Sequence, residues 1–333
     1  MSVHRYPIAT IGGGLAERTL ARSRTADGQQ APRIAVVGSG VVGTATGKGL
    51  LDKGLDVVFF DPDPTRLTSL RSEGLHAFHP DELAAGGADA YLISVPTPTV
   101  EGRANTSYVE RAAAAVGSAL GDRPGRPLVV VRSTVPPGTT DGLVKSVLER
   151  ASGRQAGVGF GLCVNPEFLR AATALDDFMN PRVILIGALD AASELALRRV
   201  YAGWQRTPIV ATTLRTAEAA KYVANVFNAA KISFFNEMLR ILTAIDVDAA
   251  TAFDAAVQGG PGFADPWYGT VCGAPYGGHC LPKDTEAFLG FAEDLGFGNL
   301  MHVLRAAMEV NDEMAAGSAV PDALTAAGVA AAG

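Results

Sequence analysis

The residue in this sequence best suited to covalent chemistry is Cys280, within the segment YGGHCLPKD at residues 276–284. Paired glycines precede it, so no side chains crowd the approach to the sulfur. Lys283 and the helix expected to follow favour the thiolate, which is the reactive form of cysteine. We therefore predict that Cys280 is a nucleophile. We assign no role to Cys163, which lies in an apolar strand, or to Cys272, which has no basic neighbours.

A second group of residues suits the binding of a phosphate-bearing ligand. Gly38, Gly40 and Gly43 form the pattern G-x-G-x-x-G where a strand gives way to a helix, and Asp61 ends the next strand. In such a site the glycines allow a tight turn, a close approach of the pyrophosphate and close helix–strand packing, while the helix N-terminus attracts the phosphates. Asp61 would accept hydrogen bonds from both adenosine ribose hydroxyls and repel a 2′-phosphate. The pattern therefore predicts NAD as the cofactor, in preference to NADP.

Three neighbouring residues complete this predicted cofactor site. Val41 and Val42 lie at the start of the helix that would receive the phosphates. Arg66 follows the acid by five residues and leaves alternatives open, because it could soften the exclusion of NADP, stack near the adenine or face solvent.

Apolar strands alternate with helical segments through the first two thirds of the chain. Strands are expected at residues 33–37, 56–60, 90–95, 128–132, 159–164, 183–186 and 207–211. Helical stretches such as 108–120 and 190–203 lie between most of them. Strands that are apolar on both faces are typical of a parallel sheet covered by helices. We predict a Rossmann-type, doubly wound and mostly parallel α/β sheet.

The organisation changes after residue 212. Residues 213–245 contain no proline or glycine and carry an apolar stripe, which predicts one long helix. A glycine-rich loop at 259–278 follows, and helices resume from Thr285. The expected domains are a flexible extension at 1–30, an NAD-binding domain at 31–211, an all-helical central domain at 212–314 and a low-information tail at 315–333.

Composition excludes several classes of protein. The formal charge is −6 and no lysine- or arginine-rich block occurs, which argues against nucleic-acid binding. No apolar run approaches the roughly 20 residues that span a bilayer. The three cysteines show neither disulfide nor metal-ligand spacing, so we expect no metal and a reducing, cytoplasmic setting.

Five motifs in order resemble the UDP-glucose/GDP-mannose dehydrogenase family over about residues 33–311. They are SVPTP at 94–98, STVPPGT at 133–139, NPEFLR at 165–170, EAAKYxxN at 218–225 and the Cys280 segment. The resemblance implies oxidation of the primary alcohol of a sugar nucleotide to a carboxylate, with two NAD consumed per product. It also implies that Cys280 attacks the intermediate aldehyde, giving a thiohemiacetal and then a thioester that water hydrolyses.

The resemblance assigns roles to the other motif residues. Lys221 and Asn225, one helical turn apart, would stabilise the oxyanion, where each donor is typically worth about 3 kcal/mol. Thr134 and Asp284 would hold the catalytic water, and Glu167 would be the general base. From the residues alone, Glu167 and Asp284 could each merely cap a helix.

Further contacts follow from the same matches. The implied cofactor contacts are Val95, Pro96, Thr97, Ser133, Thr134 and Lys283. The implied substrate contacts are Phe168, Leu169, Arg170, Lys221, Asn225, Tyr276 and Gly277. In the family the long helix forms a dimer core, so a homodimer is expected here, because the helix should expose an apolar face.

Three departures from the family concern the substrate. The chain ends soon after Asn311, where the family continues into a nucleotide-gripping domain. Ala171 stands where the family has a glutamate, and residues 263–267 lack the arginine that reaches a neighbouring subunit's substrate. Either the chain is a fragment, or it is a specialised enzyme for a nucleoside or smaller sugar derivative. The joint loss of the glutamate and the arginine favours the specialised enzyme.

Two other functions stay open. One is a two-electron alcohol dehydrogenase that stops at the aldehyde, because thioester hydrolysis could be slow without a carboxylate at Ala171. The other is an NAD-binding partner subunit without catalysis. The intact set of predicted catalytic residues argues against the second.

Overall fold

The computed structural model describes residues 32–121, 123–270 and 272–317. The predicted extension at 1–30 and most of the predicted tail lie outside these residues. The described residues form two compact units that divide between Val223 and Ala224, within the long helix α8 (Leu214–Ala244). The predicted boundary at 211/212 lies just before this helix.

The first unit is built on an eight-stranded sheet in the order β10-β9-β8-β7-β4-β1-β2-β3. Its strands are β1 (Arg33–Val37), β2 (Asp56–Phe60), β3 (Ala77–Phe78), β4 (Ala90–Ile93), β7 (Leu128–Val131), β8 (Gly161–Val164), β9 (Ile184–Ala188) and β10 (Ile209–Thr212). All neighbours pair in parallel except β8 and β9, which are antiparallel. The predicted mostly parallel sheet is confirmed, with strand ends shifted by one or two residues.

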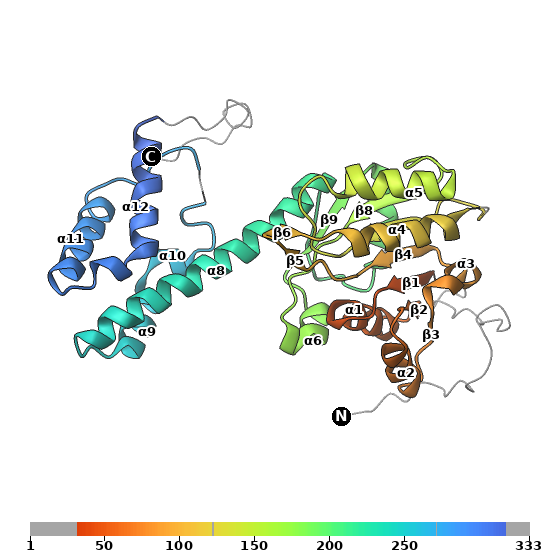
Figure 1. Cartoon of the computed structure of the whole chain (residues 1–333), viewed down its shortest axis with the longest axis horizontal. Coiled ribbons are helices and arrows are strands. Elements are labelled where there is room, and N and C mark those ends of the chain that lie inside the picture. Colours follow the sequence, from red (N-terminus) through yellow and green to blue (C-terminus); the bar gives the residue numbers. More distant parts are fainter. Residues whose placement is uncertain (1–31, 122, 271, 318–333) are drawn as a thin grey trace. The chain divides into compact units, whose positions relative to one another are not determined.

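Helices cover both faces of this sheet (Figure 1). They are α1 (Val41–Asp52), α2 (Pro64–Ser72), α3 (Leu83–Gly86), α4 (Ser107–Leu120), α5 (Lys145–Ser152), α6 (Ala174–Met179) and α7 (Ala191–Val200), with single turns at Pro80–Glu82, Thr140–Val144 and Ala171–Thr173. Alternate strand residues face opposite layers, so Val37 belongs to the buried layer that includes residues of α4 and α5, whereas Val36 belongs to the layer that includes residues of α1, α2, α6 and α7. The strands are therefore held between two buried layers of hydrophobic side chains, one on each face of the sheet.

Sequence patterns missed two short features. One is β3, a two-residue edge strand beside β2. The other is an antiparallel hairpin of β5 (Thr99–Val100) and β6 (Arg103–Ala104). Both are too short to show periodicity, because two residues cannot establish an alternation.

The topology gathers the predicted motifs at one edge of the sheet. Strand order reverses between β1 and β4, and the carboxyl ends of adjacent parallel strands meet at that edge. The glycine motif follows β1, Asp61 follows β2, and the motifs at 94–98, 133–139 and 165–170 follow β4, β7 and β8. This is the edge where a doubly wound sheet binds ligands.

The long helix starts at the same edge. Thr212, the last residue of β10, pairs with Gly187 of β9, which pairs with Val164 at the end of β8. A Cβ on Gly187 would lie 2.6 Å from the Cβ of Ala217, so the first turns of α8 pack directly on this glycine. The observed span of α8 confirms the long helix that the apolar stripe predicted.

The second unit is helical. Besides the later part of α8 it contains α9 (Ala249–Gly259), α10 (Pro261–Ala264), α11 (Leu281–Asp294), a turn at Gly298–Leu300 and α12 (His302–Ala315). The prediction that helices resume from Thr285 was wrong, because α11 begins four residues earlier. Pro282 lies in the first turn, where its missing N–H costs no helical hydrogen bond.

The described part of the chain contains no helix that is both long and apolar enough to cross a membrane. Within the same residues, no group of three or more metal-ligating side chains is found.

Candidate active site

The glycine motif has the backbone that a pyrophosphate site requires. Gly38 has a φ of +94°, and a Cβ there would lie 2.7 Å from the carbonyl oxygen of Ser94. A Cβ on Gly43 would lie 2.0 Å from the carbonyl oxygen of Gly38, so α1 can pack onto the turn only with glycine. A Cβ on Gly40 would meet nothing within 4 Å. The open side of the loop therefore lies at Gly40, at the N-terminus of α1.

Asp61 is fixed beside this loop. Its carboxylate accepts the backbone N–H of Ser39 at 2.6 Å and that of Asp63 at 2.9 Å, and the residue is 9% exposed. Each carboxylate oxygen can accept more than one hydrogen bond, so capacity remains for two hydroxyl groups. Arg66 lies on the exposed surface of α2, and Val42 is half-buried beside the more exposed Val41.

The next two motifs are hydrogen-bonded to each other. The Thr97 hydroxyl donates to the carbonyl oxygen of Thr134 at 2.8 Å, and the Ser133 hydroxyl donates to that of Val95 at 2.7 Å. Pro96, between them, is exposed. The structure thus brings these predicted cofactor contacts from β4 and β7 together.

The buried Lys221 forms an ion pair with the largely buried Glu167. The Lys221 Nζ lies 3.2 Å from Glu167 Oε1, and the two side chains are 7% and 12% exposed. The same ammonium lies 5.6 Å from the ring centre of Phe168, a cation–π contact. Two predicted catalytic residues, 54 positions apart in the sequence, therefore meet where β8 ends and α8 begins.

The rest of the 165–170 motif is also held in place. Glu167 Oε2 accepts the backbone N–H of Leu169 at 2.5 Å. The exposed Arg170 donates to both carboxylate oxygens of Asp177, and this pairing holds the pKa of Asp177 well below its usual range. In this structure the predicted substrate contact Arg170 binds a carboxylate of its own chain.

A buried hydrogen-bond network, which the sequence did not predict, supports the loops of the 133–139 and 165–170 motifs. Arg132 and Tyr201 both bond to the side chain of Asn165, and Arg132 also donates to the Tyr201 hydroxyl at 2.7 Å. Arg132 directly precedes the 133–139 motif, and Asn165 opens the 165–170 motif. A charged residue at the end of an apolar strand was the signal that could have revealed it, since a buried guanidinium needs hydrogen-bond partners.

The remaining predicted catalytic residues belong to the second unit. Asn225 is an exposed residue of α8, one turn past Lys221. Cys280 is an exposed, free cysteine at the N-cap of α11, and Lys283 forms an ion pair with Asp284 in the first turn. No side chain caps the start of α11. Asp284 therefore does not act as the N-cap.

The predicted substrate contacts in the preceding loop are the partly buried Tyr276 and the exposed Gly277.

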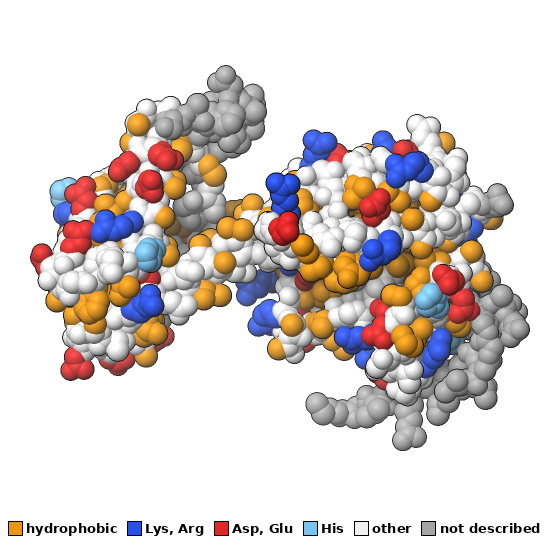
Figure 2. Space-filling view, in the orientation of Figure 1, with side chains coloured by type: hydrophobic (Ala, Val, Ile, Leu, Met, Phe, Trp, Pro, Cys, Tyr) orange, Lys and Arg blue, Asp and Glu red, His pale blue; other side chains and the backbone are white. Residues whose placement is uncertain are grey.

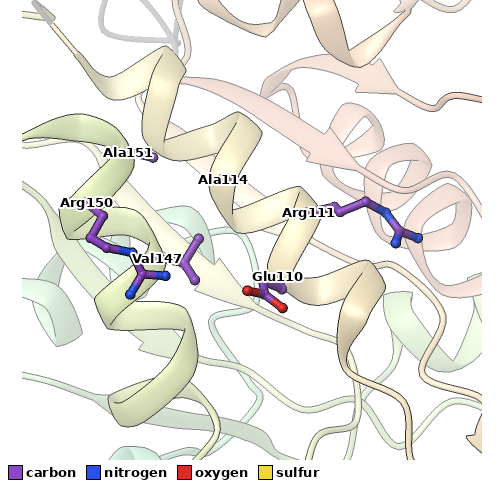
Figure 3. A pocket seen from close by; sticks show the side chains of 6 residues that line it. All are labelled: Glu110, Arg111, Ala114, Val147, Arg150 and Ala151. Atoms are coloured by element: carbon purple, nitrogen blue, oxygen red, sulfur yellow. The ribbon is translucent and has the colours of Figure 1, made fainter.

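A hollow of about 390 Å³ lies elsewhere on the first unit, between α4 and α5 (Figure 3). Its lining is Glu110, Arg111, Ala114, Val147, Arg150 and Ala151. None of these residues belongs to a predicted site, so this hollow is separate from the motif edge.

Comparison with known families agrees with this geometry. The NAD binding domain of the UDP-glucose/GDP-mannose dehydrogenase family matches residues 81–205, and the central domain of that family matches residues 215–313. Residues 33–115 also match the family described as NADP oxidoreductase, coenzyme F420-dependent. This third match covers the glycine motif and is consistent with a nicotinamide dinucleotide site.

Individual relatives are similar over most of this chain. A GDP-mannose 6-dehydrogenase from Pseudomonas putida is 34% identical over 77% of this chain and 63% of its own length. A UDP-glucose 6-dehydrogenase from Haloferax volcanii is 33% identical over 84% of this chain and 69% of its own length. The chain thus spans slightly less than two thirds of the first relative.

Solved structures show the same relationship. A ternary complex of GDP-mannose dehydrogenase from Pseudomonas aeruginosa has a TM-score of 0.78 at 31% identity, covering 85% of this chain and 69% of that one. A UDP-glucose dehydrogenase from Pyrobaculum islandicum has a TM-score of 0.66 at 36% identity, covering 86% of this chain and 69% of that one. On these matches and on the five ordered motifs, the chain belongs to the UDP-glucose/GDP-mannose dehydrogenase family.

Proposed function

We propose that this chain oxidises the primary alcohol of a sugar nucleotide to a carboxylate, with NAD as the hydride acceptor and Cys280 as the nucleophile. The observation that carries the proposal is the ion pair of Lys221 and Glu167 at the ligand-binding edge of the sheet. The names of the relatives, which act on GDP-mannose or UDP-glucose, support the substrate class.

The glycine motif and Asp61 fit NAD. Gly40 is open to close approach, and Asp61 is held by two backbone N–H groups, one of them that of Ser39 in the same loop. When bound, NAD accepts the hydride from the carbinol carbon. Thr97, Ser133 and Val95 would position the nicotinamide end of the cofactor.

Lys221 stabilises the oxygen that becomes negative in the first oxidation. As the carbinol carbon loses a hydride and the hydroxyl proton leaves to water, charge develops on the alkoxide oxygen. The Lys221 ammonium is already desolvated and held by Glu167 and Phe168, so little reorganisation is needed when that charge appears. Asn225 would add a second donor from the next turn of α8.

Cys280 carries the second oxidation. Its thiolate sulfur forms a bond to the aldehyde carbon, and the carbonyl π electrons move to the oxygen that Lys221 stabilises. A second hydride then leaves the same carbon and a thioester remains. Water activated by Glu167 adds to the carbonyl, the carbon–sulfur bond breaks, and the acid and the thiolate are released. Each alcohol thus consumes two NAD and one water.

A substrate panel tests the proposal. The full chain is incubated with NAD and, separately, GDP-mannose, UDP-glucose and other UDP-sugars, and free nucleosides, and NADH and acid are measured. Two NADH per sugar nucleotide are expected, with no acid from Cys280→Ala. Turnover of free nucleosides alone would replace the sugar-nucleotide class with the smaller substrates that the absent arginine and Ala171 favour.

A two-electron oxidation is the second candidate, and it rests on Ala171. This exposed residue offers no carboxylate where the family pattern expects one. One NADH per alcohol with accumulated aldehyde would establish it. A non-catalytic partner subunit would show no turnover with any alcohol and no substrate protection of Cys280 against alkylation at neutral pH.

We further propose a homodimer formed through α8. Its exposed apolar side chains include Val223 at 68%, Val226 at 63%, Phe227 at 63% and Ile232 at 63% exposure. Hydrophobic side chains are visible along this helix in Figure 2. Exposed apolar surface of this kind commonly marks an interface. The three free cysteines are in keeping with a reducing, cytoplasmic setting.

A further inference from the structure

A buried glutamate near the start of α8 has no role in the reaction proposed above. Glu218 is 2% exposed and lies one helical turn before Lys221. Its Oε2 accepts the backbone N–H of Gly138 at 2.6 Å, and its Oε1 accepts that of Thr140 at 2.8 Å. Burial raises the pKa of Glu218 above its usual range, while the two N–H groups act in the opposite direction. Both carboxylate oxygens are thus used to hold one short backbone segment.

The backbone N–H groups of residues 138–140 need a hydrogen-bond acceptor from another part of the chain. Residues 138–140 lead into the helical stretch Thr140–Ser152, whose first N–H groups have no partners within the helix. The side chain of Thr139, at the N-cap position, makes no capping hydrogen bond. A carboxylate at a helix N-terminus is also favoured by the helix dipole. Glu218 therefore caps this helix from a position about 80 residues later in the chain.

The cap connects two parts of the candidate site. The segment that it holds is continuous with Ser133 and Thr134, while Glu218 shares a face of α8 with Lys221. Arg215, one turn earlier on α8, adds an exposed ion pair with Asp141 at 2.7 Å. A shift of α8 along its axis would thus change the distance between the Lys221 amine and the Thr134 loop unless Glu218 prevented it.

We propose that Glu218 is a positioning residue that fixes Lys221 relative to the Ser133–Thr134 loop by capping the helix that follows this loop. The inference rests on the proposed function, because it assigns Lys221 the oxyanion role. It predicts an effect on turnover that is transmitted through Lys221.

The same helix supplies a matched control. Glu237, on the later part of α8, is 6% exposed and accepts the backbone N–H groups of Val303 at 2.7 Å and Leu304 at 3.1 Å. These groups lie at the start of α12, so Glu237 caps a helix within the second unit as Glu218 does within the first. Glu237 is not part of the proposed catalytic machinery.

The test compares Glu218→Gln and Glu237→Gln in the full chain. A glutamine can accept only one of the two N–H groups, because its amide NH₂ would face the other. For Glu218→Gln we expect kcat to fall by about tenfold to a hundredfold, the size that a displacement of about 1 Å can produce, with KM for NAD unchanged. For Glu237→Gln we expect kcat within about twofold of the parent, since misplacement should be confined to α12.

A Lys221→Met background separates positioning from a general loss of structure. If Glu218 acts through Lys221, adding Glu218→Gln to Lys221→Met should lower the residual kcat by less than about twofold, because the coupled effects are not additive. An equal fractional loss in both backgrounds would overturn the proposal, as would an equal loss from Glu237→Gln.

Hydrogen exchange gives a readout that does not depend on activity. In Glu218→Gln, or in Glu218→Asp if the glutamine variant does not fold, the amides of residues 138–144 should exchange faster than in the parent. Unchanged exchange would contradict the cap itself. If the parent oxidises no alcohol but the exchange result holds, the proposed function fails while the structural link stands.

Discussion

The two units of this chain hold their predicted catalytic residues in different ways. In the first unit the buried Lys221 is paired with the largely buried Glu167, and the loops around them are joined by further hydrogen bonds. In the second unit Cys280 is exposed, and the exposed Lys283 forms an ion pair with its neighbour Asp284. The predicted oxyanion residue Lys221 is therefore held in place by contacts within its own unit, whereas the predicted nucleophile Cys280 is exposed in its unit.

The two units also differ in the size of their hydrophobic cores. The sheet unit buries two continuous hydrophobic layers, one on each face. In the described part of the helical unit the third buried cluster consists of Ile241, Ala292 and Met301, with partly buried neighbours. Burial of apolar surface is the main stabilising term, at roughly 25 cal/mol per Å². Among the described residues, the helical unit therefore has the smaller buried core.

The largest expected effect comes from Cys280→Ala. Acid formation should fall by at least about a thousandfold, because no other side chain in the proposed site can form the thioester. The melting temperature should stay within experimental error, because the residue is exposed. Calorimetry and acid assays on the same preparation check both parts. Substantial acid formation would refute the covalent route.

Lys221→Met should lower both the turnover number and the stability of the fold. We expect kcat to fall by about a hundredfold to a thousandfold, the usual cost of removing one oxyanion donor. Stability should also fall, by about 1–3 kcal/mol, because Glu167 keeps only part of its hydrogen bonding in a largely buried position. Denaturant unfolding with Cys280→Ala as the control separates these effects. A stable but inactive Lys221→Met would show that the ion pair adds no stability. The two units would then not differ in how firmly they hold their predicted catalytic residues.

Phe227→Asp tests the helical unit's need for a partner. The side chain is 63% exposed on α8, so the change should not disturb either core. A charge placed in an apolar interface costs several kcal/mol, so we expect the parent chain to sediment as the proposed dimer and Phe227→Asp to sediment as a monomer at micromolar concentration. The exposed Glu309→Asp substitution on α12 serves as the control. Retention of the dimer would place the interface elsewhere.

The smallest expected effect is that of Asp61→Ala. Loss of the carboxylate should raise KM for NAD by about tenfold and allow NADP to be used, since the repulsion of a 2′-phosphate disappears. kcat at saturating NAD should change little. Steady-state kinetics with both cofactors is the measurement. Continued exclusion of NADP would mean that the loop geometry, and not Asp61, decides the choice.

The fold was largely readable from the sequence, for identifiable reasons. The strands are apolar on both faces, and the glycine and acid pattern marks β1, α1 and β2, so local signals and tertiary structure agree. The antiparallel pairing of β9 was not readable, because strand direction depends on the path of the connection from β8 and not on composition. The edge strand β3 was missed since it is only two residues long.

The candidate site was only partly predictable. Chemistry-bearing residues such as Lys221 and Glu167 carry recognisable types in recognisable motifs. Residues that only hold them, such as Arg132 and Glu218, read as ordinary charged positions, because their partners are backbone N–H groups or amides far away in sequence. Such roles depend on three-dimensional proximity, which no local pattern encodes.

The contact between Gly187 and Ala217 has a consequence for how the sequence can vary. Gly187 lies in β9 and has no assigned role in the reaction, yet the first turns of α8 pack in the space that a side chain there would fill. In a saturation library selected for turnover, this strand position should accept almost no replacement, while the neighbouring Ala188 should accept several. Sequence change at Gly187 would then be limited by the need to keep the Lys221 amine in position, because α8 carries both Ala217 and Lys221. A compensating substitution would have to arise on α8.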